Sequence, residues 1–590
     1  MTICLLLALL AQEIDTMNYK GARGHGSMFR RVESEAEQRE FQALQKVANP
    51  GQRHLLAEGF LVKYPASWLL AGVYQAAASA SLELNDGARA LEQGRSSLRL
   101  LPENPSLLVV VAQVEIALGQ RAPAARDARD ALLWLSLFAA PAGTKDADWK
   151  KVSKTIAESA RAVIEQAGGR PPVFEPAATG HDKSQKFAGS DACKTCHAAI
   201  HDAWRKTGMA SMLSPIAQAS LLADFSQKIE YSSDGVQVSV RAGGGNRPYF
   251  ELPQPNGSSW KRYRIDYVIG SKWQQAYATK LGDGRLFVFP IQYNALEKKW
   301  INYWATIDPP GSERADTASF SRLSMATNYQ RNCAACHTSQ LKLLRLDDTT
   351  MQKAAFHEPG INCEMCHGPS ARHATSPETP VPLRFSKLNH MDATLICGQC
   401  HRQSALRNLG PNGEMNYTLD QPYYDRLVSQ PLAEFGTRAF YKDGRFRETT
   451  FIGEAMQRSA CFRRGTAQCA SCHDPHPRDA GAANPKSLKF RDDPDRMCVQ
   501  CHIAAGAQGT AHTHHPRESA GARCAACHMP PIMNSLRFLA ASHQIDDIPR
   551  ADHTLRFGQK DSPNACLICH KDQRAEWVET QLKNWKTPPR

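Results

Sequence analysis

Long apolar runs are missing from most of this 590-residue chain. After the opening MTICLLLALLAQE, no segment reaches the roughly 18 uninterrupted apolar residues that a membrane-spanning helix needs. The mature chain is therefore expected to have no transmembrane span. The opening run is apolar but has no basic residues before it, so we interpret residues 1–13 as the remnant of a signal peptide. Residues 14–52 follow as a polar segment, and export to the periplasm or the cell exterior is expected.

The sequence also lacks a concentrated basic stripe with interleaved aromatic side chains. This holds although Lys and Arg outnumber Asp and Glu by 71 to 58, which gives a formal net charge of +13. Such a stripe is the usual electrostatic footprint of a nucleic-acid-binding protein. We therefore expect no nucleic-acid partner.

Cysteines that could form disulfide bonds are scarce. Of the 18 cysteines, 16 fall in eight copies of one pattern, C-x-x-C-H, which leaves only Cys4 and Cys461. A disulfide framework is therefore not the organising principle of the fold, despite the high cysteine count. We interpret Cys461 as a buried structural thiol, with a redox role as the alternative.

The eight C-x-x-C-H copies, numbered motifs 1 to 8 in chain order, carry the chemistry of the sequence. With 18 Cys and 21 His, chance would give about 0.02 copies. The pattern is the attachment signature of c-type haem, in which two thiols add across the vinyl groups of the porphyrin and the adjacent imidazole becomes the proximal iron ligand. Zinc sites also use C-x-x-C pairs, but they do not require a histidine after every second cysteine. The predicted cofactor is therefore eight covalently bound haem c groups.

The residues of the eight motifs are assigned accordingly. The predicted haem-attaching cysteines are Cys193, Cys196, Cys333, Cys336, Cys363, Cys366, Cys397, Cys400, Cys469, Cys472, Cys498, Cys501, Cys524, Cys527, Cys566 and Cys569. The predicted proximal ligands are His197, His337, His367, His401, His473, His502, His528 and His570. Each ferric haem with two ionised propionates carries a net charge of about −1, so eight haems bring the total charge to about +5. Many Arg and Lys side chains are then expected to pair with propionates.

A second axial ligand for each iron can be sought by counting histidines. From residue 181 onward, eleven histidines lie outside the motifs, and up to eight irons compete for them. The predicted distal candidates are His373, His476, His553, His512, His514, His515, His357, His390 and His543. At least one of the three clustered histidines at 512–515 is expected to be a ligand. His181 and His201 complete the eleven and are not assigned.

Methionine is the alternative distal ligand, and it raises the potential of a haem relative to two histidines. After motif 1, the run KTGMASML contains Met209 and Met212, and only His201 is nearby. Met209 is therefore a candidate ligand of the haem at motif 1. The alternative is that both methionines fill gaps in a core.

Three regions are predicted along the chain. Residues 53–166 are expected to form helices, because apolar residues recur at helical spacing within 107–118 and 124–135. Two stretches there resemble tetratricopeptide units, with an ordinary helical bundle as the alternative. A Gly/Pro-rich linker over 167–188 leads to an octahaem cytochrome c domain over 189–590.

Residues 225–305 differ in texture from the rest of the cytochrome domain. KIEYSSDGVQVSVRA and GDGRLFVFPIQYN alternate around Asp-Gly turns at Asp234–Gly235 and Asp283–Gly284, which predicts a small antiparallel β insertion. The remaining chain offers only about 50 residues per haem, so short helices and long loops wrapped on the haems are expected. The predicted fold is mainly α: an N-terminal tetratricopeptide-like helical region, then a loop-rich multihaem cytochrome c domain with this β insertion.

The flanks of the motifs resemble a known group of proteins. FAGSDACKTCHAAIHDAW, GINCEMCHGPSARH, CASCHDPH, CAACHMP and SPNACLICHKDQRAEW are similar to segments of multihaem cytochromes related to the tetrahaem electron carrier of ammonia oxidisers. The resemblance is closer to bacterial members that combine this module with tetratricopeptide repeats, and it covers nearly all of 187–586. It implies haems stacked in close parallel and perpendicular pairs, mostly with two histidine ligands. By this resemblance His373, His476 and His553 are distal ligands.

Two departures from the family pattern matter. Many relatives have a histidine after the first motif where this chain has Thr207-Gly208-Met209, which leaves the ligation of the first haem open. No C-x-x-C-K motif is present, which argues against the pentahaem nitrite reductase pattern with its lysine-ligated catalytic haem.

Electron transfer along a haem chain, between a redox protein donor and a redox protein acceptor, is the expected function. The alternative is an octahaem oxidoreductase that acts on a small nitrogen or sulfur compound at one open iron, because the fold alone does not decide between them. No catalytic residue is assigned. Helical repeats offer surfaces that hold partners, so docking through residues 53–166 or self-association is a further expectation.

Overall fold

The computed structural model describes most of the chain. The described residues are 34–137, 145–174, 186–233, 236–254, 259–307, 313, 315–341, 355–402, 404–406, 427–429, 440–481, 483–535, 537–545 and 550–585. The predicted signal remnant, His181 and the Asp234–Gly235 turn lie outside them. Within these ranges, no helix has the length and apolar character that crossing a membrane requires.

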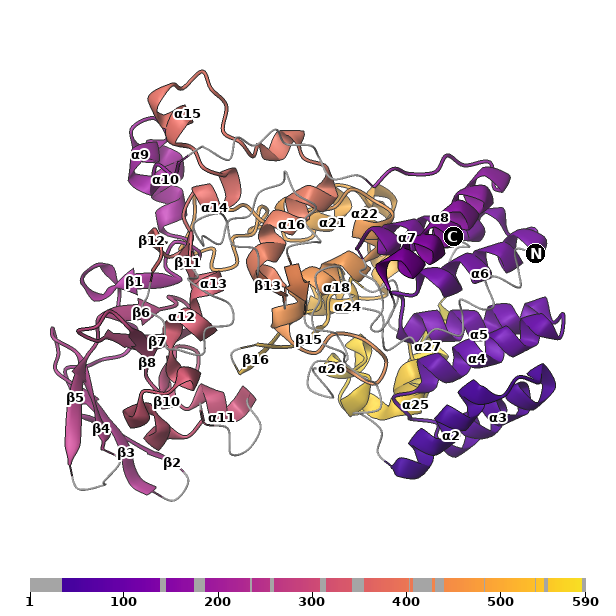
Figure 1. Ribbon diagram of the computed structural model, residues 1–590, viewed down its shortest axis with the longest axis horizontal. Coiled ribbons are helices and arrows are strands. Elements are labelled where there is room, and N and C mark those ends of the chain that lie inside the picture. The colour runs from indigo at the N-terminus through magenta and orange to yellow at the C-terminus, as the bar shows by residue number, and fades with distance from the viewer. Residues whose placement is uncertain are drawn as a thin grey trace.

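Seven described helices form the N-terminal region, drawn in indigo and purple in Figure 1. They are α2 (Glu35–Lys46), α3 (Pro50–Lys63), α4 (Leu70–Glu83), α5 (Gly87–Leu100), α6 (Pro105–Ala117), α7 (Arg121–Leu137) and α8 (Asp146–Gln166). Asn49, Asp86 and Asn104 cap α3, α5 and α6, and each accepts a backbone N–H bond from three positions later, at 2.9, 3.0 and 3.1 Å. Proline at the first position of α3 and of α6 suits a place where the N–H would be unpaired anyway.

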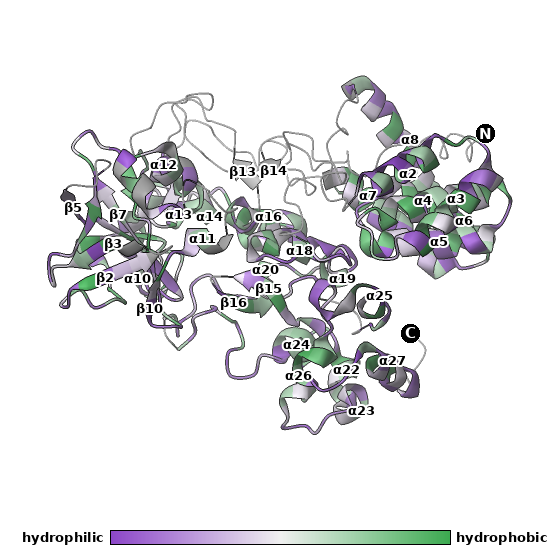
Figure 2. Cartoon of the chain, turned by 90° about the horizontal axis from the view of Figure 1, so that it is seen from below, coloured by the Kyte–Doolittle hydropathy of each residue, from purple (hydrophilic) through white to green (hydrophobic). Residues whose placement is uncertain are grey.

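The helices of this region pack in sequence, most extensively α4 on α5 and α6 on α7. Leu70 and Pro105, which begin α4 and α6, are 35 positions apart, and Gly87 and Arg121, which begin α5 and α7, are 34 apart. Tetratricopeptide units repeat at about 34 residues. Helix α6 is buried almost throughout, since α5, α7 and α8 surround it, and green hydrophobic residues lie on these helices in Figure 2. The helices predicted within 107–118 and 124–135 are confirmed as α6 and α7.

Two antiparallel sheets follow motif 1. Their strands are β1 (Leu213–Pro215), β2 (Ile229–Ser233), β3 (Val236–Gly243), β4 (Tyr249–Pro253), β5 (Trp260–Arg264), β6 (Tyr267–Ile269), β7 (Gln274–Lys280), β8 (Leu286–Val288), β9 (Gln292–Asn294) and β10 (Lys299–Ile301). One sheet has the order β1-β6-β7-β9-β10 with β8 also paired to β7, and the other has the order β2-β3-β4-β5. The turn at Asp283–Gly284 joins β7 to β8, and Gly284 adopts a φ of 89° there. The antiparallel strands predicted in this part of the chain are confirmed.

The rest of the described chain consists of short helices, short strand pairs and loops. The motif-bearing helices are α9 (Ser190–Lys194), α13 (Ala334–His337), α14 (Glu364–His367), α16 (His390–His401), α20 (Cys469–Cys472), α21 (Arg496–Val499), α24 (Cys524–His528) and α26 (Ala565–Cys569). The others are α10 (Ala198–Arg205), α11 (Tyr303–Ile307), α12 (Tyr329–Asn332), α15 (Ala371–Thr375), α18 (Ile452–Arg458), α19 (Ala460–Arg463), α22 (Ile503–Gln508), α23 (Thr510–Thr513), α25 (Asp552–Asp561) and α27 (Ala575–Asn584). The strand pairs are β11 (Thr338–Ser339) with β12 (Glu358–Pro359), β13 (Ser404–Leu406) with β14 (Leu427–Ser429), and β15 (Pro531–Ser535) with β16 (Phe538–Ala541). In Figure 1, α16, α18, α21, α22 and α24 lie in the centre, between the two sheets and the helical region, whereas α9, α10 and α15 lie above the sheets.

A buried ion pair holds the helical region against this central part. Arg458, at the end of α18, binds Glu103 through two hydrogen bonds, one of them 2.9 Å, and both side chains are 2% exposed. Arg458 also donates to the carbonyl of Gly444. Gly444 has a φ of +85° and touches the Leu100 carbonyl so closely that a Cβ would lie 1.9 Å from that oxygen. The helical region and the central part are therefore in close contact at this point.

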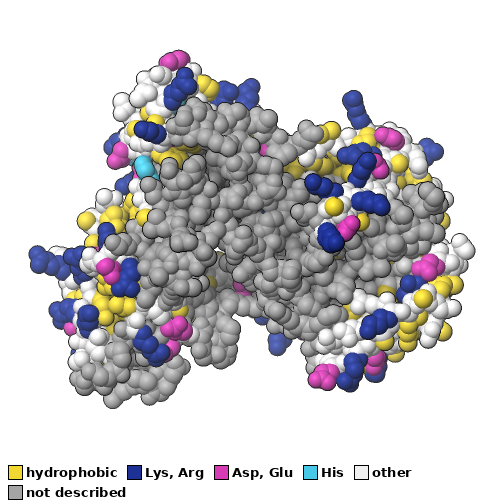
Figure 3. Space-filling view, viewed as in Figure 1, with side chains coloured by type: hydrophobic (Ala, Val, Ile, Leu, Met, Phe, Trp, Pro, Cys, Tyr) yellow, Lys and Arg dark blue, Asp and Glu magenta, His cyan; other side chains and the backbone are white. Residues whose placement is uncertain are grey.

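Charges of both signs are interspersed on the described surface in Figure 3, over the sheets as well as over the helical region. Several are neighbours of opposite sign: on the edge strand β5, Arg262 lies 2.8 Å from Glu251, and at its end Arg264 lies 2.7 Å from Asp266. Charged side chains on an edge strand also discourage pairing with another chain. The positive charge of the sequence is thus partly neutralised locally.

Candidate haem sites

The motifs fold locally into about one helical turn. In motifs 1, 3, 5, 6 and 8, the histidine N–H donates to the carbonyl of the first cysteine at 2.9–3.0 Å. Positions i, i+3 and i+4 lie on one face of such a turn, so the two thiols and the imidazole project from the same side. The C-x-x-C-H spacing therefore suits one planar group held at two edge positions and at its central metal.

Cysteines from different motifs meet in pairs. Thiol hydrogen bonds join Cys193 to Cys363, Cys336 to Cys400, Cys397 to Cys469 and Cys498 to Cys524. These contacts bring motif 1 beside motif 3, motif 2 beside motif 4, motif 4 beside motif 5, and motif 6 beside motif 7.

Electrostatic effects between thiols show the remaining neighbours. Burial, and then the charge of Cys498, raise the pKa of Cys472 to about 11, so motif 5 lies beside motif 6. Burial, and then the charge of Cys527, raise the pKa of Cys566 to about 11, so motif 7 lies beside motif 8.

Motif 4 has the most neighbours among the described motifs. The pKa of Cys400 is raised by its hydrogen bond with Cys336, by burial, and by the charges of Cys336 and Cys366. Motif 3 is therefore close to motif 4 as well. The motifs follow one another in space in the order 1, 3, 4, 5, 6, 7 and 8, and motif 2 stands beside motif 4.

Four proximal histidines face a second histidine ring. The ring centres are 6.3 Å apart for His197 and His373, 6.3 Å for His473 and His543, 6.2 Å for His528 and His512, and 6.2 Å for His570 and His515. A metal–imidazole bond is about 2 Å long and the ring centre lies about 1.1 Å beyond the nitrogen, so two imidazoles on opposite sides of one metal have centres about 6.3 Å apart. The separations in all four pairs fit an iron held between two histidines.

Backbone carbonyls orient several of these rings. Nδ1 lies 2.7 Å from the Thr379 oxygen in His373, 2.7 Å from the Thr513 oxygen in His515, 3.1 Å from the Ala541 oxygen in His543 and 3.0 Å from the Lys486 oxygen in His473. An Nδ1–H that donates to a carbonyl leaves Nε2 as the free lone pair. The second nitrogen of each ring is therefore prepared to bind a metal.

At motif 3, the neighbouring histidines are detected by their electrostatic effect on His367. Burial lowers the pKa of His367, and the nearby His476 and His197 lower it further. Nδ1 of His367 lies 3.3 Å from the Leu383 carbonyl, so its Nε2 is the free nitrogen. His476 and His197 are therefore both near enough to His367 to act on it electrostatically.

The clustered histidines at 512–515 separate into three environments. His512 faces motif 7 and His515 faces motif 8, as described above. His514 instead stacks on Trp585, with ring centres 4.3 Å apart and planes 16° apart, and its backbone is left-handed with a φ of 55°. The sequence predicts at least one ligand in this cluster, and two of its three rings each face the proximal histidine of a different motif.

The other candidates contact groups other than a proximal histidine. His390 has its Nε2 3.1 Å from the Phe462 carbonyl, His357 lies 6.0 Å from the Phe187 ring, and His553 lies 5.9 Å from the Phe557 ring. Among the described residues, no ring contact places a second imidazole at the iron-spanning distance from the proximal histidines of motifs 2, 3, 4 and 6. At motif 3, the nearby His476 acts on His367 electrostatically.

Met209 lies beside the segment that leads into motif 3. Its carbonyl accepts the Ile361 N–H at 3.0 Å and the Met212 N–H at 3.2 Å. The ring at the iron-spanning distance from His197 is that of His373. Near motif 1, a histidine ring thus faces the proximal histidine, and Met209 as an iron ligand stays a prediction.

Two carboxylates that were not assigned from the sequence bind motif 1 to motif 3. Glu364, buried inside motif 3, accepts backbone N–H bonds from Ala188, Gly189 and Ser370 at 2.9, 2.9 and 2.7 Å. Glu358 accepts the N–H of Ser190 at 2.7 Å and its hydroxyl at 2.9 Å. An acidic residue between the two cysteines of a motif is the signal that would have indicated this role.

Replacing Glu364 with alanine should loosen this contact. Three N–H groups would lose their acceptor, two of them in buried bonds. An unsatisfied buried donor costs about 1–3 kcal/mol. We expect a lower midpoint of thermal unfolding and increased protease cleavage near residues 186–190, measured on the haem-loaded protein. Glu378→Ala, which removes an exposed carboxylate on the same segment, should leave both unchanged; equal effects of the two variants would contradict the assignment.

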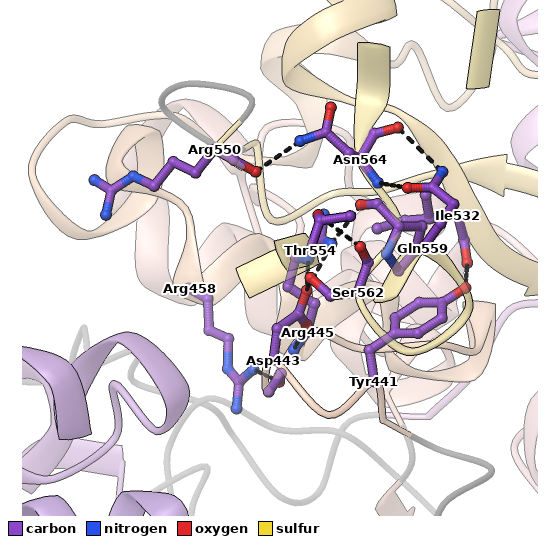
Figure 4. A network of polar contacts seen from close by, with 12 residues as sticks. Tyr441, Asp443, Arg445, Arg458, Ile532, Arg550, Thr554, Gln559, Ser562 and Asn564 are labelled. Carbon is purple, nitrogen blue, oxygen red and sulfur yellow. Dashed lines mark hydrogen bonds and ion pairs between the residues drawn. The ribbon is translucent and has the colours of Figure 1, made fainter. Parts of the chain in front are cut away.

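A second polar network, shown in Figure 4, fixes motif 8. Asp443 accepts bonds from the Ser562 hydroxyl at 2.7 Å and from Arg445 Nε at 2.8 Å. Asn564 caps α26 by accepting the Cys566 N–H at 2.9 Å, and its amide donates to the Arg550 carbonyl at 2.6 Å. The first cysteine of motif 8 is therefore positioned by a buried scaffold.

Two protein families match segments that contain motifs 2, 3, 5 and 6. The family "Cytochrome c554 and c-prime" matches residues 292–368, and the family "Doubled CXXCH motif" matches residues 462–507. A curated relative, the dissimilatory sulfite reductase MccA of Wolinella succinogenes, is 22% identical over 313 residues, which cover 47% of this chain and 38% of that protein. The crystal structure of the outer cell wall cytochrome OcwA aligns with a TM-score of 0.47 and 18% identity, covering 68% of this chain and 87% of that chain. The eight motifs and the two family matches together support covalent binding of c-type haem, as in multihaem cytochromes.

Proposed function

We propose that the chain binds eight haem c groups, one at each motif, and conducts electrons between a donor protein and an acceptor protein after export. When bound, haem supplies an iron that alternates between two oxidation states. The observation that carries the proposal is the unbroken adjacency of the motifs from 1 through 3, 4, 5, 6 and 7 to 8. Adjacent attachment cysteines bring neighbouring haem edges together, as conduction requires.

In this proposal, a second histidine would complete the coordination of most of the irons. The histidines that would hold the irons together with the proximal ones are His373 for motif 1, His476 for motif 3, His543 for motif 5, His512 for motif 7 and His515 for motif 8. An iron with two protein ligands changes oxidation state without binding substrate. The carbonyl bonds to Nδ1 hold the rings in place, which keeps the coordination the same in both oxidation states.

The N-terminal helices serve this function as a tetratricopeptide-like support. The spacing of α4 to α7 favours such units over an ordinary bundle. Glu103 and the Leu100–Gly444 contact join the support to the part of the chain that carries motifs 5 to 8. The support leaves its far side for a partner or a second copy.

Removing single haems tests the proposed path. Cys397→Ala/Cys400→Ala would remove the haem of motif 4, through which motif 3 connects to motif 5. We expect reduction by a protein donor, followed by stopped-flow absorbance, to change from one fast phase to a fast and a slow phase. Cys333→Ala/Cys336→Ala removes the haem of the side motif 2 and should leave the fast phase intact. If the motif 4 and motif 2 variants were reduced with the same kinetics, the proposed electron path would be wrong.

Motif 2 supports a second candidate function, an oxidoreductase acting on a small nitrogen or sulfur compound at an open iron. Among the described residues no second imidazole faces His337, and the buried hydroxyl of Tyr329 has no hydrogen-bond partner. The similar protein from Wolinella succinogenes is named a dissimilatory sulfite reductase. Steady oxidation of a reduced viologen by sulfite or nitrite, abolished in Cys333→Ala/Cys336→Ala, would favour this function over conduction alone.

A further inference from the structure

Buried carboxylates form a cluster where the helical region meets the segment before motif 5. Glu115 of α6 and Asp130 of α7 are 0% and 1% exposed, and Asp127 of α7 is half-buried beside them. Arg463 and Arg464, which precede motif 5, both bind Oδ2 of Asp130, the second at 3.2 Å.

Two carboxylate oxygens in this cluster have no hydrogen-bond partner among the described residues. They are Oε2 of Glu115 and Oδ1 of Asp130, and both atoms are buried. Burying an anionic oxygen without a hydrogen-bond donor costs free energy, and protonation of the carboxylate removes the buried charge. The cluster therefore offers sites for a proton.

Each charged group around Glu115 can be identified from the helices that surround it. Helix α5 contributes Arg95, which binds the other oxygen of Glu115, and α7 contributes Asp127. Helix α8 packs on α6 through apolar residues of the shared core, among them Ile156 and Ala160. Burial, and then the charge of Asp127, raise the pKa of Glu115 to about 7, and Arg95 opposes them.

Asp127 has its own set of neighbours. Burial, and then the charge of Asp130, raise its pKa, while Arg95, Arg464 and Arg126 lower it. Arg95 and Arg464 are 43% and 36% exposed, so protons reach the cluster from its solvent edge.

The cluster lies one short helix away from two motifs. Cys461 of α19 is close enough to Cys472 of motif 5 to contribute to the raised pKa of that thiol, after burial and Cys498. Phe462 shares a core with Leu395 and Ile396 of α16, the helix that carries motif 4. In general, at an effective dielectric of about 20, a unit charge about 10 Å from a carboxylate changes the proton-binding constant of that carboxylate by roughly tenfold.

We infer that the Glu115–Asp127–Asp130 cluster is a redox-linked proton site, which takes up a proton from solvent when the haems at motifs 4 and 5 are reduced. This inference rests on the proposed function. One electron from the donor protein reduces one ferric iron, and one solvent proton converts a carboxylate of the cluster to a carboxylic acid. Reoxidation by the acceptor protein returns both.

A redox titration of the haem-loaded protein between pH 6 and 8 tests the inference. At a fixed solution potential, the ratio of reduced to oxidised haem should rise several-fold from pH 8 to pH 6 in the wild type. Glu115→Gln, which cannot ionise, should change the ratio by less than twofold, and the exposed control Glu92→Gln should behave as the wild type. Equal pH responses of Glu115→Gln and the wild type would overturn the inference. Haems that never equilibrate with one another in the same titration would instead overturn the proposed conduction.

Glu115→Gln could alter the redox behaviour by misfolding, so the pH dependence of the free energy of unfolding serves as a second test. Glu115 ionises near its ordinary pKa of 4.5 in the unfolded chain but near 7 in the folded chain, so the folded state holds the extra proton between these values. The free energy of unfolding therefore falls as pH rises from about 4.5 to 7, relative to Glu115→Gln. Asp127→Asn should also reduce the redox pH response. If the two unfolding profiles run parallel, or if Asp127→Asn leaves the redox response unchanged, the cluster holds no such proton.

Discussion

Replacement of His512 by alanine is expected to open one iron in the protein. His512 faces the proximal His528 of motif 7 with 6.2 Å between ring centres, and the two ring planes differ by 7°. Without His512, the sixth position of that iron is vacant. The reduced variant should therefore bind one more carbon monoxide per protein than the wild type, and a new high-spin ferric signal should appear in its electron paramagnetic resonance spectrum.

The neighbouring histidines supply matched controls for this experiment. His515→Ala should also add one carbon monoxide, at the iron of motif 8, because His515 faces His570. His514→Ala should add none, because His514 stacks on Trp585 instead of facing a proximal histidine. If His514→Ala opened an iron and His512→Ala did not, the ligand assignment in this cluster would be wrong.

Replacement of Arg458 by alanine is expected to lower the free energy of unfolding by about 3–5 kcal/mol, because it removes the positive charge that binds the buried Glu103 carboxylate. Unfolding of the haem-loaded protein in guanidinium, followed by far-ultraviolet circular dichroism, would measure the loss. Arg39→Ala breaks the pair with Glu35, whose side chains are 71% and 90% exposed. An exposed pair contributes at most about 1 kcal/mol, so Arg39→Ala should be nearly neutral.

The double variant Arg458→Met/Glu103→Leu distinguishes the effect of the buried charges on stability from the effect of side-chain packing. It removes both partners, so no unpaired charge remains and much of the lost stability should return. A double variant as unstable as Arg458→Ala would show that the guanidinium stabilises the fold by another contact, such as its position 4.2 Å over the Phe446 ring.

Local features of this protein are predictable from its sequence because they depend on short-range spacing. The C-x-x-C-H turn follows from an i to i−4 hydrogen bond, and the hairpin at Asp283–Gly284 follows from the residue types that such a turn requires. The helical period of residues 107–118 likewise predicts α6. Each signal lies within a dozen residues.

Contacts between distant segments are not predictable in this way. Met209 draws attention near motif 1 because it is close in the sequence, whereas His373 reaches His197 only because motif 3 folds beside motif 1. Arg458 and Glu103 are separated by 355 positions, and neither lies in a recognisable pattern. A count of histidines shows how many ligands are available, but only the fold assigns each ring to an iron.

The stoichiometry of carbon monoxide binding to the fully reduced, haem-loaded protein tests the central claim most directly. Four of the eight proximal histidines face a second histidine ring in the structure, and we propose His476 as the second ligand of a fifth iron, at motif 3. The account therefore predicts at most three carbon monoxide molecules per protein. Binding of four or more would show that irons assigned here as closed are open, and it would contradict a chain built chiefly for conduction.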